Sequence, residues 1–217
     1  MSILVYAISR DDARAPAARE LHEICAAGLR ALAEPVEEPL AADLEELVRY
    51  EETVEAVMQG HTILPMRFGS VVDDENDIRE LLKARAREFA VALAHLDGAV
   101  EFGVQASVTS DSGRAAAGRP AAAGPGASYM LARVEEQRCG RELQAWLDAA
   151  LAEVVRERVY RVTPVCGPGS ISGAYLVDRQ EQEQFLGRIA GLAEAADHTL
   201  SWSGPWPPYT FVEGLDR

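Results

Sequence analysis

The sequence predicts an α/β (α+β) protein with two small domains. Short runs rich in β-branched and aromatic residues alternate with longer amphipathic segments, which is typical of sheets and helices that share a core. A stretch dominated by Ala, Gly and Pro then interrupts this alternation at residues 111–126. We therefore expect an N-terminal domain over 1–110, a linker over 111–126, a C-terminal domain over 127–201 and a tail over 202–217.

The first three segments set the pattern. Residues 2–9, SILVYAIS, predict a buried strand because they are rich in β-branched and aromatic side chains. Residues 14–27 predict a helix that carries Ala18, Leu21 and Cys25 on one face and ends at Gly28. The following LRALAEPVEE leaves two alternatives open: a continuation of this helix or, because of its proline, a short edge strand.

A helix over residues 41–59 comes next, with one apolar stripe and a strongly acidic opposite face. The stripe comprises Leu44, Leu47, Val54, Val57 and Met58. Residues 61–72 predict a strand, in which Pro65 marks an edge position or a bulge. Asp73 or Asp74 caps the helix that follows, because a carboxylate there accepts free backbone N–H groups.

The stripe of that next helix predicts the buried positions Ile78, Leu82, Phe89, Leu93 and Leu96. Residues 99–109 then alternate as a strand, with one face formed by Val100, Phe102, Val104 and Ala106. A ferredoxin-like split βαβ unit with an added helix is the simplest fold for this order of elements.

The second half repeats the order of elements without repeating the sequence. We expect a helix over 127–157, strands over 158–165 and 170–178, a helix over 179–196, and a strand from 198 that becomes an extended tail. The helix stripes comprise Leu143, Leu147, Leu151 and Val154, then Phe185, Ile189 and Leu192. This half is expected to form a modified ferredoxin-like α+β domain with an extended C-terminal tail.

The net charge narrows the class of partner. The chain carries 21 Lys and Arg against 35 Asp and Glu, which gives −14. Binding to nucleic acid or to an anionic membrane surface needs clustered positive charge, so we expect neither partner. No apolar stretch approaches eighteen residues, as a membrane-spanning helix requires. A basic or neutral apolar partner fits better, although solubility alone also explains the charge.

The three cysteines indicate a reducing compartment. Cys25, Cys139 and Cys166 lie far apart and have no zinc-site spacing with each other or with histidine. The apolar run at residues 3–8 is too short for a signal peptide. We therefore expect reduced thiols and a cytoplasmic protein.

No catalytic motif stands out. The four histidines, His22, His61, His95 and His198, have no metal-ligand spacing. Residues 166–173, CGPGSISG, follow a strand but lack the Gly-Lys-Ser/Thr of a phosphate-binding loop, so they indicate a hairpin turn. We expect no catalytic residue, no cofactor and no metal, and therefore no enzyme. A small-ligand enzyme acting near residues 166–173 is the remote alternative.

The segment LPMRFGS, residues 64–70, is more specific. Pro65 removes a backbone donor, Phe68 offers a large apolar body, and Gly69 allows a backbone conformation closed to other residues. Arg67 lies between them and is able to pair with the nearby acidic residues. We interpret Pro65, Arg67, Phe68 and Gly69 as a partner-binding edge. The alternative is an ordinary ion pair at a strand end beside a core phenylalanine.

The C-terminal SGPWPPYTFV is the strongest single feature. Its prolines stiffen the chain and its aromatic rings offer a large apolar area at little entropic cost. The residues expected to pack are Trp202, Trp206, Pro207, Pro208, Tyr209 and Phe211. They either clamp against their own protein or dock on a partner. If the Trp206 ring is fully buried against the second domain, its replacement by Ala should cost about 3–5 kcal/mol.

Both segments resemble the signature segments of the gas vesicle protein GvpL/GvpF family. The stretches are HTILPMRFGSVV and SGPWPPYTFV, and VYAIS near the start and ASYMLARVEEQ at 127–137 are also similar. The resemblance covers nearly the whole chain in order, without separating the GvpF and GvpL branches. One departure precedes LPMRFG, where many members have a helical histidine and this chain has Tyr50 or Glu51.

The resemblance implies an accessory protein of gas vesicles, the gas-filled protein shells that make some microbes buoyant. The resemblance also implies a fold of two α/β domains, the first of them ferredoxin-like, followed by a C-terminal tail. The implied partners are the small hydrophobic shell protein GvpA and other gas vesicle accessory proteins. The implied role is chaperone-like help in nucleation or assembly, in the cytoplasm and at the gas vesicle. The alternative is a minor structural component of the shell.

Overall fold

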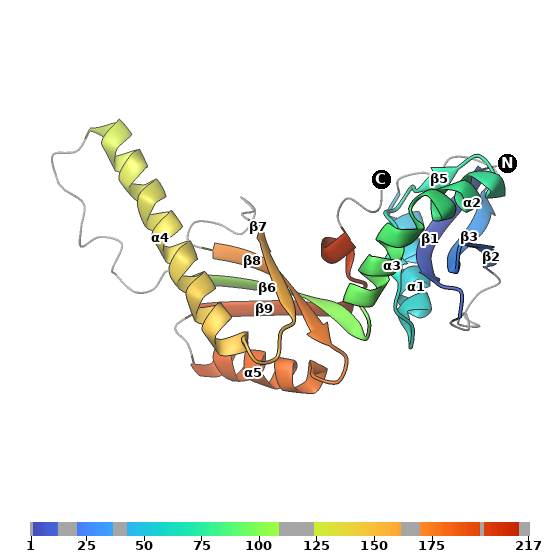
Figure 1. Cartoon of the computed structure of the whole chain (residues 1–217). Coiled ribbons are helices and arrows are strands. Elements are labelled where there is room, and N and C mark those ends of the chain that lie inside the picture. The colour runs from blue at the N-terminus through green and yellow to red at the C-terminus, as the bar shows by residue number, and fades with distance from the viewer. Residues whose placement is uncertain are drawn as a thin grey trace. The chain divides into compact units, whose positions relative to one another are not determined.

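The structure is a computed structural model that describes residues 2–12, 21–36, 43–108, 124–161, 170–195 and 198–212. The chain forms two compact units. One comprises Met1–Glu101 and Pro205–Arg217, and the other comprises Phe102–Gly204. Each unit combines helices with one antiparallel sheet, which confirms the predicted α/β fold class (Figure 1). The units divide within strands, whereas the sequence-based boundaries placed all of 1–110 in one domain.

The sheet of the first unit has the strand order β2-β3-β1-β4, and β5 also pairs with β1. Strand β1 (Ser2–Arg10) is central, and its residues from Ile3 to Ser9 are all buried, as predicted. The partners of β1 are β3 (Leu29–Val36), β4 (Leu64–Pro65) and β5 (Val71–Val72), all antiparallel.

A β-hairpin replaces part of the helix that the sequence predicted over 14–27. Strand β2 (His22–Ala26) pairs with β3 through a two-residue turn at Ala27 and Gly28, with φ angles of 55° and 76°. Two positive φ values match the right-handed twist of a hairpin, so Gly28 serves the turn and does not end a helix. The predicted helix is wrong from residue 22 onward, and residues 13–20 lie outside the described residues.

Strand β3 also settles the two alternatives for LRALAEPVEE. It lies between β2 and β1, so it is neither a helix nor, along most of its length, an edge strand. Pairing with β2 ends at Ala33, so Pro35 has a neighbour only in β1, where it lies opposite Ile3. A proline is tolerated there because no second strand requires its missing N–H.

Helix α1 (Leu44–Met58) begins at Asp43, whose carboxylate accepts a hydrogen bond from the Glu46 N–H at 2.9 Å. Its buried residues are Tyr50, Thr53, Val54, Val57 and Met58. The sequence stripe was therefore right in its second half and wrong at Leu44 and Leu47, which are 76% and 40% exposed. The packed face of α1 includes Tyr50. The predicted stripe omitted Tyr50 because only apolar residues were counted and tyrosine carries a hydroxyl group.

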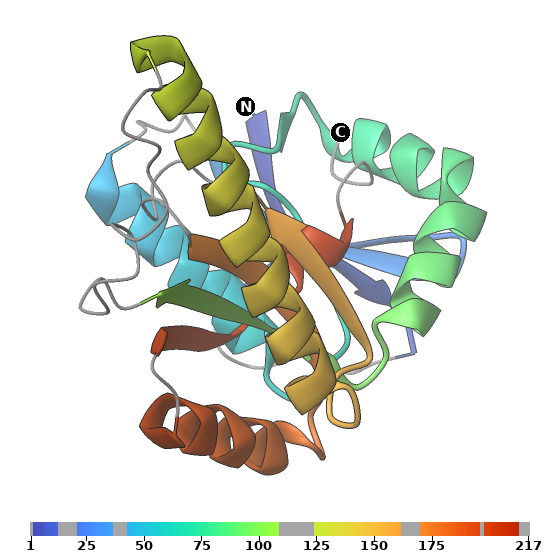
Figure 2. The ribbon, with the colours of Figure 1, turned by 90° about the vertical axis from the view of Figure 1, so that its left-hand side faces the viewer.

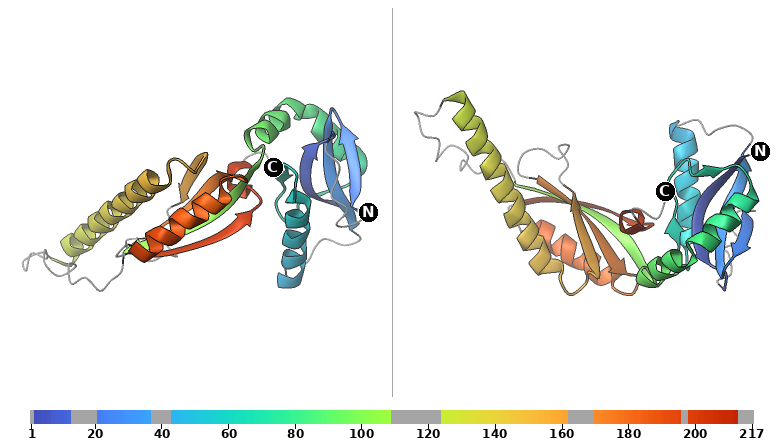
Figure 3. Two further views of the ribbon diagram at one scale, coloured as in Figure 1. Left: turned by 90° about the horizontal axis from the view of Figure 1, so that it is seen from below. Right: turned by 45° about the horizontal axis from the view of Figure 1, so that its top comes forward.

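Two helices follow where the sequence predicted one. Asp74 caps α2 (Glu75–Ala84) by accepting from the N–H groups of Asn76 and Asp77, and the backbone breaks at Arg85 before α3 (Ala86–His95). All five predicted stripe residues are buried. Figure 3 shows α1 on one face of the sheet and α2 and α3 on the other.

The second unit has the element order β-α-β-β-α-β. Its elements are β6 (Ala99–Val108), α4 (Pro125–Leu151), β7 (Glu157–Arg161), β8 (Ser170–Asp178), α5 (Gln182–Ala195) and β9 (His198–Trp206). The strand order β7-β8-β6-β9 is that of a ferredoxin-like split βαβ fold. Helices α4 and α5 lie over the same face of the sheet (Figure 2). Of the predicted glycine-rich turn, residues 166–169 lie outside the described residues.

A polar aromatic cluster joins this sheet to its helices. The Tyr160 hydroxyl on β7 donates to Asp148 on α4 at 2.7 Å and lies 3.0 Å from the Tyr175 hydroxyl. The Tyr175 ring also contacts Phe185 of α5. Burial raises the pKa of Tyr175 to about 12, so its hydroxyl stays neutral at physiological pH.

Gly173 makes room for these two tyrosines. It lies opposite Tyr160 across the β7–β8 ladder. A Cβ atom there would lie 2.9 Å from Cε2 of Tyr175 and 3.0 Å from Cε1 of Tyr160. The Tyr175 ring is buried in the core, and the half-buried Tyr160 ring is held by its hydrogen bonds to Asp148 and Tyr175, so neither moves away freely.

We expect Gly173→Ala to destabilise the protein by about 1–3 kcal/mol, because the added methyl group overpacks the core. Chemical denaturation measures the loss. The matched control is Gly187→Ala on α5, where a Cβ meets no atom within 4 Å. That control should be neutral or stabilising by up to about 1 kcal/mol, since Ala favours helix. Equal effects of the two substitutions would contradict the prediction.

Candidate functional site

The two segments singled out in the sequence meet in the first unit. Strand β4, which contains Pro65, packs against the 3-10 helix η3 (Tyr209–Val212), which contains the end of the tail. More than 140 residues of chain separate them, since 209 − 65 = 144. The fold therefore builds one surface region from LPMRFGS and PWPPYTFV.

Residues 66–70 form a turn, so the predicted strand over 61–72 is wrong in its middle. Pro65 pairs opposite Ala7, and the Met66 N–H donates to the Tyr6 carbonyl at 2.9 Å. The chain then leaves the sheet and returns at Ser70, whose carbonyl accepts from the Val5 N–H at 2.9 Å. Gly69 has a φ of +83°, and this conformation is the reason for a glycine at that position.

Tyr50 of α1 contacts this turn through both its ring and its hydroxyl group. Its ring stacks on Tyr6 at 4.8 Å and meets Phe68 edge-on at 5.4 Å. Its hydroxyl donates to the carbonyls of Met66 at 2.8 Å and Val5 at 3.3 Å. Burial raises the pKa of Tyr50 well above its ordinary value, so it remains a neutral donor. Sequence reasoning missed this role, although Tyr50 and Glu51 were the two residues noted where the family resemblance led us to expect a histidine.

The four predicted partner-binding residues differ in exposure. Arg67 and Gly69 are exposed, Phe68 is half-buried, and Pro65 is buried. Pro65 shapes the end of β4 and offers no surface, whereas Arg67, Phe68 and Gly69 present atoms to solvent. The turn therefore presents the cationic side chain of Arg67 and the half-buried ring of Phe68 at the surface.

The tail packs on the first unit through its prolines and η3. Pro207, Pro208 and Val212 are buried, whereas Tyr209 and Phe211 are half-buried. Thr210 is fixed by Glu101, which accepts from the Thr210 N–H at 2.9 Å and from its hydroxyl at 2.7 Å. The two tryptophans behave differently from expectation. Trp202 and Trp206 lie on β9 and are 41% and 39% exposed, so Trp206 is not fully buried.

Glu51 couples the tail to α1. The Tyr209 hydroxyl donates to the Glu51 carboxylate at 3.3 Å. Partial burial raises the pKa of Glu51, the Tyr209 hydrogen bond opposes that rise, and the charge of Glu55 adds to it. Glu51 and Glu55 lie one turn apart on α1, so the like charges face each other.

The comparison with protein families decides the class of this protein. The model of the family "Gas vesicle synthesis protein GvpL/GvpF" matches residues 2–213. The chain belongs to the GvpL/GvpF family. Gas vesicle protein L of Streptomyces sp. (strain CB03234) is 30% identical over 199 residues, 81% of this chain and 74% of that protein. Gas vesicle protein F of the same strain is 29% identical over 205 residues, 85% and 84% of the two chains. These values do not separate the two branches.

Solved structures of GvpF proteins share the fold. The crystal structure of GvpF from Anabaena sp. PCC7120 matches with a TM-score of 0.79 and 17% identity, covering 98% of this chain and 96% of the other. GvpF from Microcystis aeruginosa matches with a TM-score of 0.77 and 16% identity, over 98% and 99%. Among the described residues of this GvpL/GvpF protein, we find no helix with the length and apolar character needed to cross a membrane.

The partial exposure of Trp206 lowers the expected effect of its removal. We expect Trp206→Ala to destabilise the protein by about 1–2 kcal/mol, below the 3–5 kcal/mol typical of a fully buried ring. Urea denaturation checks this value. A loss above about 3 kcal/mol would mean that the ring is more buried than the structure shows. No loss at all would mean that the ring does not pack.

The raised pKa of Glu51 predicts a pH-dependent effect of its substitution. A carboxyl group whose pKa is raised in the folded state destabilises the fold at pH values above that pKa. The penalty vanishes as the pH falls to the ordinary value of 4.5 and below. Glu51→Gln should therefore raise the stability at pH 7, by less than about 1 kcal/mol because water screens a half-exposed group.

Thermal unfolding between pH 4 and pH 8 measures this effect, and the difference between variant and wild type should shrink toward acid pH. Glu52→Gln is the matched control, because Glu52 is exposed on the same helix and its substitution should change stability little at any pH. A Glu51→Gln variant that is less stable at pH 7 would show that the charge of Glu51 helps to hold Tyr209.

Proposed function

We propose that this GvpL/GvpF protein binds the small hydrophobic shell subunit of the gas vesicle, GvpA, and keeps it available for nucleation or assembly of the shell. Membership of the family supports a role in gas vesicle formation. The observation that carries the finer proposal is the turn at 66–70, where Arg67 and Phe68 are presented on a rigid base. The protein makes and breaks no bond in this role.

The chemistry of the turn suits a protein partner. Arginine and aromatic side chains are enriched among the residues that dominate binding at protein interfaces, because they bury large areas at small entropic cost. Tyr50 orients Phe68 before any partner arrives, so little further ordering is needed. Strand β4 is only two residues long, so side-chain contacts, more than long strand addition, are expected to carry the binding.

The acidic composition suits a hydrophobic cargo. An apolar shell subunit aggregates unless its surface is covered before it assembles. A carrier with a net charge of −14 keeps the complex soluble through mutual repulsion between complexes. It also favours basic groups on the subunit around the contact.

A pull-down with purified shell subunit tests the proposal. We expect Arg67→Glu to weaken binding at least about tenfold, equivalent to about 1.4 kcal/mol, in a variant that circular dichroism shows to be folded. The matched control is Arg87→Glu on α3, which makes the same charge change at another exposed position and should bind like wild type. Absence of binding by the wild type, or equal binding by the two variants, would reject the proposal.

The second candidate is a minor structural component of the shell. The exposed rings of Trp202 and Trp206 on β9 favour it, because they offer an apolar anchor on the surface. Such a component should remain in gas vesicles that have been washed and kept intact. Its absence from washed vesicles would leave the carrier role as the better account.

A further inference from the structure

Two helices carry matching rows of exposed or partly exposed side chains. On α1 the row comprises Leu44, Val48, Glu52 and Glu55. Leu44 is 76% and Val48 is 47% exposed, and Leu47 beside them is also exposed. Because each helical residue turns the direction by about 100°, the four residues lie within about a quarter of the helix circumference.

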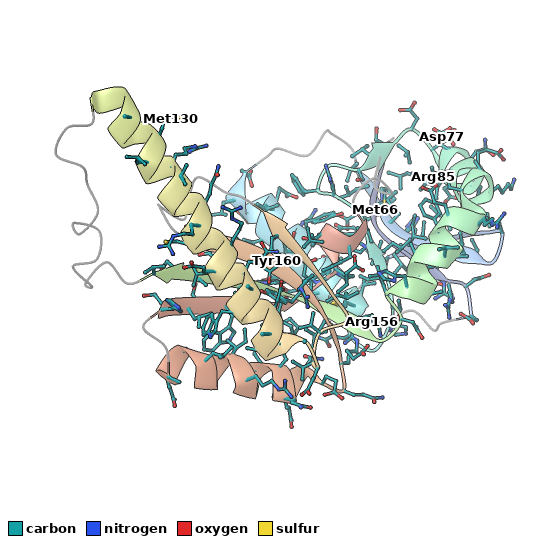
Figure 4. All side chains as sticks on the ribbon, turned by 60° about the vertical axis from the view of Figure 1, so that its left-hand side comes forward. Met66, Asp77, Arg85, Met130, Arg156 and Tyr160 are labelled. Atoms are coloured by element: carbon teal, nitrogen blue, oxygen red, sulfur yellow. The ribbon has the colours of Figure 1, made fainter. Side chains whose placement is uncertain are left out.

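Helix α4 carries a row with the same spacing and opposite charge. Met130 and Val134 are 62% and 56% exposed, and the exposed residues Arg138 and Arg141 follow them. Nine residues, about two and a half turns, separate Val134 from the buried Leu143, so the row faces away from the sheet. Figure 1 shows that the first half of α4 projects past the strands, and Figure 4 labels Met130 near its beginning.

The two rows are related position by position. Each places an apolar pair at i and i+4 and a charged pair at i+8 and i+11: Leu44, Val48, Glu52 and Glu55 on α1, and Met130, Val134, Arg138 and Arg141 on α4. When two helices pack in parallel, residues at equal spacing meet along the contact. Apolar residues then meet apolar residues, and two glutamates meet two arginines.

We propose that α1 of one copy of this protein packs in parallel against α4 of a second copy. The net charge of −14 alone would keep copies apart. The arginines of α4 provide a local positive strip that offsets this repulsion at one place. Arg138 is paired with Glu142 at 2.7 Å, but both side chains are more than half exposed, so the pair is weak and is easily exchanged for a partner's carboxylate.

The contact is small, so the association is weak and depends on concentration. Two rows of four residues bury less area than a standard stable interface of about 1,600 Å². The charged half is also screened by salt, whose Debye length falls from about 10 Å at 0.1 M to about 3 Å at 1 M. The contact leaves the turn at 66–70 uninvolved, so shell-subunit binding and self-association are tested separately.

Sedimentation velocity of the full chain over a range of concentrations tests the proposal. The wild type should sediment above its monomer mass of 23.5 kDa at high concentration and low salt, and the effect should weaken at high salt. Two charge-reversed variants, E52R/E55R and R138E/R141E, should each remain monomeric, because like charges then face each other along the contact.

An equimolar mixture of the two variants should associate again. The basic α1 of the first variant matches the acidic α4 of the second, and the acidic α1 of the second matches the basic α4 of the first. The matched control E183R/E194R on α5 changes the net charge by the same amount as E52R/E55R, from −14 to −14 + 4 = −10, at exposed positions away from both rows. It should associate at least as well as the wild type.

Three results would overturn the proposal. A wild type that stays at its monomer mass at every concentration would mean that the rows serve another protein or none. Both variants could associate as the wild type does, or their mixture could stay monomeric. Circular dichroism of each variant establishes that it is folded, so a lost association is not mistaken for unfolding.

Discussion

The hydrogen bonds of one tyrosine hydroxyl organise the first unit. The Tyr50 oxygen reaches the carbonyls of Val5 and Met66, which belong to the central strand and to the segment that follows β4. A buried carbonyl without a donor costs about 1–3 kcal/mol, so this contact fixes how α1 lies on the sheet. The Tyr50 ring fills the space between Tyr6 and Phe68, so the placement of the helix also sets the placement of the turn.

The tail depends on that same arrangement. The Tyr209 hydroxyl reaches Glu51, which follows Tyr50 on α1, and Thr210 is held by Glu101 at the start of β6. Stiff proline backbone limits the freedom that the tail loses when it packs, which makes a short segment with few buried side chains sufficient. The region shaped by Tyr50 thus draws on a helix, two strands and the end of the described chain.

Local patterns predicted the elements whose burial follows a simple period. The stripe from Ile78 to Leu96, which runs across α2 and α3, and the alternation from Val100 to Ala106 on β6 were both right, because each follows the local period of a helix or a strand. The hairpin of β2 and β3 was missed, since Leu21 and Cys25 also fit a helical spacing and the Ala-Gly turn is a weak signal. The buried positions predicted for Leu44 and Leu47 were wrong, because a sequence does not distinguish an exposed leucine from a buried one.

The candidate site was harder to foresee than its parts. LPMRFGS and PWPPYTFV were both recognisable, but their contact joins residues more than 140 positions apart, and no local rule specifies such a pairing. The function of Tyr50 also depends on two carbonyls that are distant in sequence. The composition of a single helix contains no information about them.

The first unit has a further property because both early and late residues build it. The second unit, Phe102–Gly204, lies between them in the chain. A chain leaving the ribosome at about 5–20 residues per second therefore carries β4 without its η3 neighbour while more than 140 further residues are made. The packing of β4 against η3 is consequently delayed, and only a chain translated through η3 has a finished first unit.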